Sequence, residues 1–69
     1  MLLSMATPGE KNYIKKVTGK DTTHKFLASL GFVEGAAVTI ISELSGNIIL
    51  NIKDTRVALD KSMANRIII

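Results

Sequence analysis

The sequence predicts a mainly β protein: a small, strongly bent five-stranded barrel with one short α-helix and a single helical turn before the last strand. Three observations favour this fold. The chain has only 69 residues, which supports one hydrophobic core and a single domain over residues 1–69. Hydrophobic residues make up 46% of it but aromatic residues only 4%, so aliphatic side chains must fill the core. The apolar spacing also changes from a helical to a strand period between residues 26 and 41.

The first predicted strand spans residues 13–18 and follows a Pro-Gly turn that ends at Gly9, where glycine is free to adopt a positive φ. Within this strand, Ile14 and Val17 are three residues apart. Strict alternation cannot place both side chains on one face of a sheet, so we expect a bulge between them.

A short helix follows, with a length of about nine residues and one apolar stripe. The residues of this stripe are Thr23, Leu27 and Leu30, with Phe26 beside them. Phe26 is therefore expected in or near the core. Asp21 or Thr22 carries a side-chain oxygen that can cap the free N–H groups at the start of the helix.

Gly31 follows the stripe, at the position where many helices end on a residue in the left-handed conformation. We expect Gly31 to stop the helix and Phe32 or Val33 to fold back onto its last turn. Gly35 belongs to a second turn that sets the direction of the next strand, because the period of two begins at Ala36.

The remaining strands are predicted from alternating or continuous apolar runs at residues 36–41, 48–53, 56–59 and 66–69. Tight turns are expected at 45–47 and 54–55, and Asp60 can cap the single helical turn before the last strand. Ile41 and Ile49 fall on the outward faces of their strands.

The net charge of +3 is unevenly distributed. Residues 1–33 hold five lysines against Glu10 and Asp21, whereas the charges of residues 34–69 balance. Such a basic region is either a solvated surface or a face that meets phosphate, an anionic membrane or an acidic partner. The chain has no cysteine, which favours a reducing cytosol. We expect a cytoplasmic protein that does not span a membrane, because no apolar run approaches about 18 residues.

Residues for catalysis are scarce, and we expect no enzymatic activity. His24 is the only histidine, and the chain has neither a nucleophile elbow nor a phosphate-binding glycine loop. Asp21 lies one helical turn from His24, so the two residues are weak candidates for binding a divalent transition metal. The alternative is a solvated His24 and a capping Asp21, since a tight site normally needs three or more protein ligands.

Over nearly its whole length the sequence resembles the ferrous iron transport protein A (FeoA) family. The matching positions are Leu3, Thr7-Pro8-Gly9-Glu10, Ile14, Leu27, Leu30-Gly31-Phe32-Val33, Gly35, Val38, Val57-Ala58-Leu59, Ala64 and Ile67. Glu34 departs from the family pattern, which often has proline there, and so does Asp54, where glycine is common. The resemblance implies an SH3-like β-barrel that acts in bacterial ferrous iron uptake, as a cytoplasmic accessory of a membrane permease with a cytosolic G domain.

The leading functional hypothesis is a protein-interaction module that binds this transporter. The candidate partner-binding residues are Lys15, Lys16, Lys25, Ile41 and Ile49. A small nucleic-acid-binding barrel is an alternative, but its only support is Tyr13 beside two lysines, so no nucleic-acid partner is expected. A metal-responsive regulatory domain is a further alternative, and homo-oligomerisation is left open.

Overall fold

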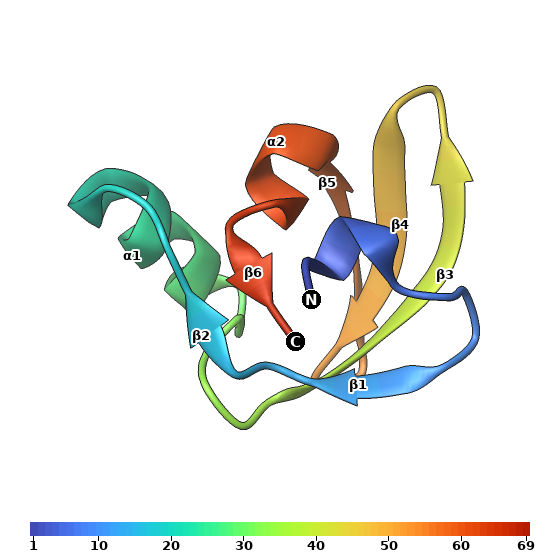
Figure 1. The fold of residues 1–69 in the computed structure, drawn as a ribbon, viewed down its shortest axis with the longest axis horizontal. Helices are drawn as coiled ribbons and strands as arrows, with labels where there is room; N and C mark the ends of the chain where they lie inside the picture. Colours follow the sequence, from blue (N-terminus) through green and yellow to red (C-terminus); the bar gives the residue numbers. More distant parts are fainter.

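The computed structural model describes residues 1–69 as six short strands, two helices and one 3-10 turn (Figure 1). In chain order these are η1 (Leu3–Met5), β1 (Lys11–Tyr13), β2 (Lys16–Val17), α1 (Asp21–Ser29), β3 (Ala37–Leu44), β4 (Asn47–Ile52), β5 (Thr55–Asp60), α2 (Lys61–Ala64) and β6 (Ile67–Ile68). The mainly β prediction is confirmed, including the short helix and the helical turn before the last strand. There is one strand more than expected, because the first predicted strand is divided into two.

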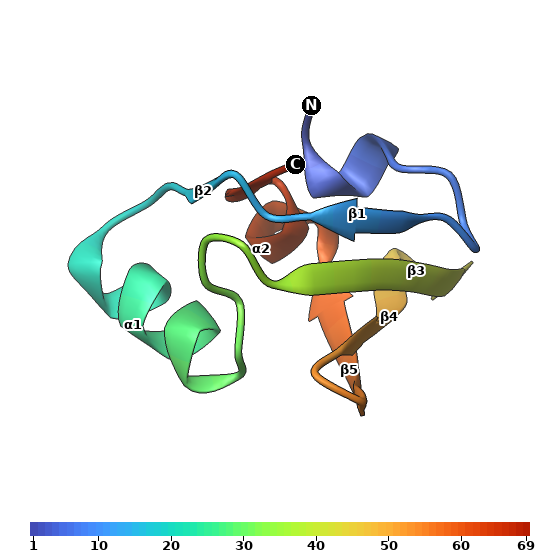
Figure 2. The same ribbon diagram turned by 90° about the horizontal axis from the view of Figure 1, so that it is seen from below.

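The strands form two antiparallel sheets. One has the order β1-β3-β4-β5, and the other pairs β2 with β6. Figure 2 shows β1 lying along β3 before the chain continues to β2. The N–H of Ile14 donates to the carbonyl oxygen of Ala36 at 2.9 Å. The next N–H, that of Lys15, donates to Ile68 at 2.7 Å. At this point the chain leaves one sheet and enters the other, and Lys15 and Lys16 both face Ile68, so the irregularity expected near these lysines coincides with a change of sheet.

The core is aliphatic, as the composition predicts. Fourteen residues are buried, and none of them is polar or charged. They are Leu3, Ile14, Val17, Leu27, Phe32, Val38, Ile40, Ile48, Leu50, Ile52, Leu59, Ala64, Ile67 and Ile69. The change of sheet after Ile14 lets both Ile14 and Val17 face this core despite their spacing of three. Phe26 is half exposed, so its expected burial is wrong, because it lies about 100° around α1 from the buried Leu27.

Two tight turns connect β3, β4 and β5. The first contains Ser45 and Gly46, with φ of 52° and 80°, and the second contains Lys53 and Asp54, with φ of 48° and 62°. Positive φ at both central residues is typical of the type I′ hairpin, whose twist matches that of the flanking strands. The second turn has no glycine, so two side chains adopt a left-handed conformation that L-residues disfavour.

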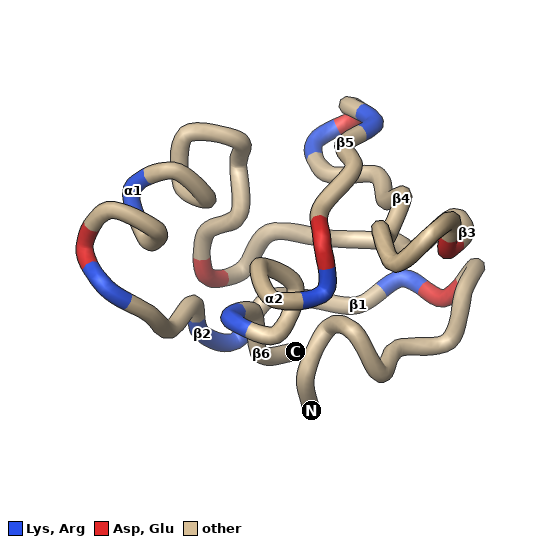
Figure 3. The backbone as a smooth tube through the Cα atoms, turned by 90° about the horizontal axis from the view of Figure 1, so that it is seen from above, with Lys and Arg blue, Asp and Glu red and all other residues tan.

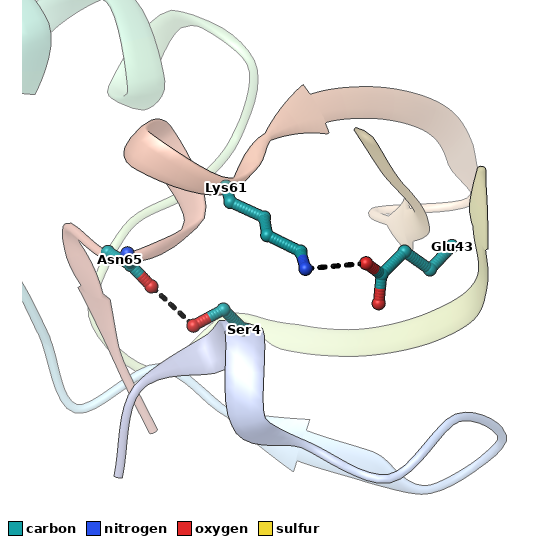
Figure 4. A network of polar contacts seen from close by, with 4 residues as sticks. All are labelled: Ser4, Glu43, Lys61 and Asn65. Atoms are coloured by element: carbon teal, nitrogen blue, oxygen red, sulfur yellow. Dashed lines mark hydrogen bonds and ion pairs between the residues drawn. The ribbon is translucent and has the colours of Figure 1, made fainter. Parts of the chain in front are cut away.

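Polar contacts hold α2 and η1 at one end of the barrel (Figure 4). Lys61 Nζ lies 2.7 Å from Glu43 Oε1, and the hydroxyl of Ser4 donates to Asn65 Oδ1. α2 begins as predicted, because Asp60 Oδ1 accepts a hydrogen bond from the N–H of Met63 at 2.8 Å. These contacts connect segments that are far apart in the sequence.

Candidate interaction surfaces

α1 ends in a Schellman motif at Gly31. The N–H of Phe32 donates to the carbonyl oxygen of Leu27, and the N–H of Gly31 donates to Ala28, both at 3.0 Å. Gly31 has a φ of +104°, which glycine adopts without steric cost. The chain therefore reverses direction at the end of α1. Phe32 enters the core and Val33 stays 39% exposed.

This reversal creates a hollow between α1, β2 and the loop that follows Gly31, with a volume of about 480 Å³. Its lining residues are Val17, His24, Phe32, Val33 and Glu34. We call it the α1 hollow. Three of its residues are apolar, while His24 and Glu34 supply an imidazole and a carboxylate. The α1 hollow is therefore suited to an apolar group that carries a polar or charged neighbour.

The candidate metal ligands lie at the start of α1 and in this hollow. Asp21 is the first residue of α1, Lys20 is the N-cap in extended conformation, and no side chain caps the helix. The expected capping by Asp21 or Thr22 is therefore wrong. Both Asp21 and His24 are exposed. No three histidine, aspartate or glutamate side chains gather as a metal-binding group. Glu34 was not predicted as a ligand, because it is distant from His24 along the chain.

The candidate lysines lie on α1, on β2 and just before β2. Figure 3 shows blue segments where β2 and β6 meet and an isolated blue segment on α1, which begins with a red segment. Lys15 and Lys16 are exposed at β2, and Lys25 is exposed on α1. None of them takes part in an ion pair, since the one ion pair joins Lys61 to Glu43.

The candidate isoleucines lie on a different surface, on the β3–β4 hairpin (Figure 1). The register of β3 shifts between Ile40 and Ser42, so Ile41 is an extra residue with no partner on β4 and is 39% exposed. Ile49 is half-buried opposite Ala58. Its expected exposure on an outward face is only partly met. The candidate set is thus divided between two surfaces.

A second hollow, of about 360 Å³, lies on the outer face of the four-stranded sheet. Its lining includes Lys11, Thr39, Asn51 and Lys53. Tyr13, two residues after Lys11 in β1, pairs with Ala37 of β3 and is 61% exposed. Tyr13 therefore belongs to the strand that carries Lys11 and not to β2, whose lysines were grouped with it on the sequence.

One titratable group departs clearly from its ordinary behaviour. The hydrogen bond from the Met63 N–H, followed by that from the Ser62 hydroxyl, lowers the pKa of Asp60. This carboxylate caps α2, so its role as a helix cap explains the lowered pKa without a functional site. Neither helix is long and apolar enough to cross a bilayer.

Together these features define a class: a small, mainly β, SH3-like barrel that presents a hollow and a cationic surface. A comparison with protein-family models identifies the family within this class. The FeoA domain matches residues 1–69, and the chain belongs to this family. The family is associated with ferrous iron transport. None of the curated proteins matches the chain.

Three solved structures illustrate the similarity. An iron uptake regulatory protein (FeoA) superimposes with a TM-score of 0.89 at 26% identity, covering 97% of this chain and 91% of the other. Iron(II) transport protein A from Clostridium thermocellum gives 0.91 at 29% identity, with coverage of 97% and 43%. Stenotrophomonas maltophilia FeoA, a zinc complex, gives 0.86 at 26% identity, with coverage of 99% and 87%. That protein is described as a prokaryotic SH3 domain protein possibly acting as a ferrous iron transport activating factor.

Proposed function

We propose that this protein is a cytoplasmic accessory of bacterial ferrous iron uptake that binds the cytosolic G-domain region of the membrane iron transporter. Membership of the FeoA family supports the connection with iron transport. The description of the Stenotrophomonas maltophilia relative as a possible activating factor supports an accessory role. Binding, and not chemistry, is the mode of action that we infer from this support.

The observation that carries the proposal is the α1 hollow. Val33 gives it an exposed apolar surface, with the buried Val17 and Phe32 behind it, and a partner side chain inserted there is removed from water. The two elements that line it also carry exposed lysines, Lys16 on β2 and Lys25 on α1. The complementary partner segment has one apolar anchor with carboxylates beside it.

A calorimetric titration with the purified cytosolic domain of the transporter tests this proposal. The domain is loaded in turn with GDP and with a non-hydrolysable GTP analogue, because the partner surface can differ between nucleotide states. We expect saturable binding in at least one state. The absence of binding in both states at high micromolar concentration would contradict the proposal.

A divalent transition metal is the second candidate ligand of the α1 hollow. His24 and Glu34 line it together, and the Stenotrophomonas maltophilia relative is a zinc complex. Two protein donors form an incomplete site, so we expect weak binding that leaves positions for water or a partner residue. Titration with zinc, followed through the His24 ring resonances by NMR, tests this candidate. Unchanged resonances at millimolar zinc rule out His24 as a ligand, and a His24→Asn variant controls for non-specific effects.

A further inference from the structure

Four exposed cationic residues from two distant parts of the chain lie in and beside the two-stranded sheet. They are Lys15, Lys16, Lys20 and Arg66, and we call this surface the β2–β6 cationic face. β2 and β6 pair with Lys16 opposite Ile68 and with Val17 opposite Ile67. Val17 and Ile67 are buried, so the alternation of a strand turns Lys16 outward.

Arg66 is held beside this lysine cluster by the backbone. The N–H of Thr18 donates to the carbonyl oxygen of Arg66 at 2.7 Å, and the Thr18 hydroxyl donates to the same oxygen at 3.1 Å. A methyl group at Gly19 would lie only 3.5 Å from Arg66 Cδ, so the arginine side chain passes over the loop that leads to Lys20. Figure 3 shows the resulting concentration of blue segments around β2 and β6.

The charges of this face are uncompensated. None of its four residues takes part in an ion pair. Like charges held together by a rigid fold repel one another and raise the local positive potential, which attracts an external anionic group. Two carboxylates lie near this face without pairing with it: Asp21 at the start of α1, and Glu34, whose neighbour Gly35 donates its N–H to the carbonyl oxygen of Ile14 at 2.8 Å.

The shape of the face favours a lipid surface over a nucleic acid or a single peptide. Neither hollow of the protein is lined by any of its four residues, and none of them is aromatic. The face therefore lacks a groove for a chain segment and a ring for base stacking. An anionic leaflet requires neither, because it attracts closely spaced lysines and arginines through its surface potential, by about fivefold in affinity for each charge.

We propose that the β2–β6 cationic face docks on the anionic lipid headgroups of the cytoplasmic leaflet. The biological setting rests on the proposed function, which places the protein at a membrane transporter. β2 carries Lys16 on this face and Val17 in the lining of the α1 hollow, so docking through this strand would keep the hollow near the leaflet. Weak attachment of this kind raises the effective concentration of the protein beside its partner.

Co-sedimentation of the full chain with lipid vesicles tests the proposal without the transporter. The probes are vesicles of phosphatidylcholine alone and vesicles mixed with phosphatidylglycerol. Lys15→Glu/Lys16→Glu reverses two charges of the face. Lys11→Glu/Arg56→Glu is the matched control, since it reverses two exposed strand cations elsewhere and also changes the net charge from +3 to −1. Circular dichroism verifies that both variants are folded.

We expect the wild type to bind only the anionic vesicles, more weakly at higher salt. Lys15→Glu/Lys16→Glu should reduce this binding by about 25-fold or more, and the control by much less. No binding by the wild type, or equal loss in both variants, would overturn the proposal. It would also be overturned if the wild type bound a single-stranded oligonucleotide through this face but no vesicle. Because the vesicles contain no transporter, failure here is distinguishable from failure of the calorimetric titration.

Discussion

The N–H of Phe32 donates a hydrogen bond to the carbonyl oxygen of Leu27 at 3.0 Å, and this bond reverses the chain at the end of α1. Both side chains are buried, so the backbone contact and the hydrophobic contact act together. Phe32 and Val33 then line the α1 hollow from the loop side. The site that we propose for partner binding therefore depends on the geometry of this helix end.

Replacing Gly31 tests that dependence. Gly31→Val places a β-branched side chain at a φ of +104°, and its Cβ would lie 3.2 Å from Lys53 Cδ and 3.5 Å from Ile52 Cγ1. We expect the free energy of unfolding to fall by about 1–3 kcal/mol. Urea denaturation followed by circular dichroism measures it. Gly35→Ala is the control, because its φ is also positive but its Cβ would meet nothing within 4 Å, so its loss should be smaller. An unchanged stability of Gly31→Val would mean that the helix end is misassigned.

The turn between β4 and β5 offers a stabilising change. Asp54 has a φ of 62° without being glycine, and a left-handed L-residue costs about 1–2 kcal/mol. Glycine removes this cost but loses more backbone entropy on folding, by about 0.5–1 kcal/mol. We therefore expect Asp54→Gly to stabilise the protein by about 0.5 kcal/mol. Thermal unfolding measures the change, and a lower melting temperature for Asp54→Gly than for wild type would contradict it.

The cap of α2 makes the stability of the folded protein depend on pH in the acid range. Hydrogen bonds from Met63 and Ser62 hold the pKa of Asp60 below its ordinary value of 3.8. The stabilisation by this carboxylate is complete above that ordinary value and is lost as the pH falls through the lower pKa of the folded state. We expect Asp60→Asn, which can still accept the Met63 N–H, to lessen the decline in stability below pH 3.8. Identical acid-unfolding curves for wild type and Asp60→Asn would refute this contribution.

The ion pair between Lys61 and Glu43 should contribute little to stability. Its atoms are only 2.7 Å apart, but the side chains are 54% and 51% exposed, and water screens their attraction. We expect Glu43→Gln to change the free energy of unfolding by less than about 0.5 kcal/mol. Chemical denaturation at low and high salt measures this effect, and a loss above about 1 kcal/mol would show that the contact is cooperative with its surroundings.

Local sequence patterns predicted much of the fold. The stripe ending at Leu30 and the glycine after it place the end of α1, and alternation places β3 and β4, because these signals lie within one element. The change of sheet at Ile14 was not predictable in this way. Its cause is the pairing of β2 with β6, which begins with the hydrogen bond from the Lys15 N–H to Ile68, a residue 53 positions distant that leaves no local signal.

The candidate surfaces were less predictable than the fold. His24 was identified from its chemistry, but its proximity to Glu34 follows from the loop geometry after Gly31. The sequence grouped Lys15 with Lys16 and could not add Arg66, which reaches them through the pairing of β2 with β6. It also grouped Tyr13 with these lysines, although Tyr13 pairs with β3 in one sheet and Lys16 pairs with β6 in the other. In each case a long-range contact decides which side chains meet.

The most direct measurement is calorimetric binding of the transporter cytosolic domain to two matched variants. Val33→Asp places a charge in the α1 hollow, and Ile41→Asp places one on the β3–β4 hairpin, where the side chain is equally exposed at 39%. The account predicts that wild type and Ile41→Asp bind, while Val33→Asp binds at least tenfold more weakly, as expected for a buried, unpaired carboxylate. Binding that survives Val33→Asp and is lost in Ile41→Asp would contradict it.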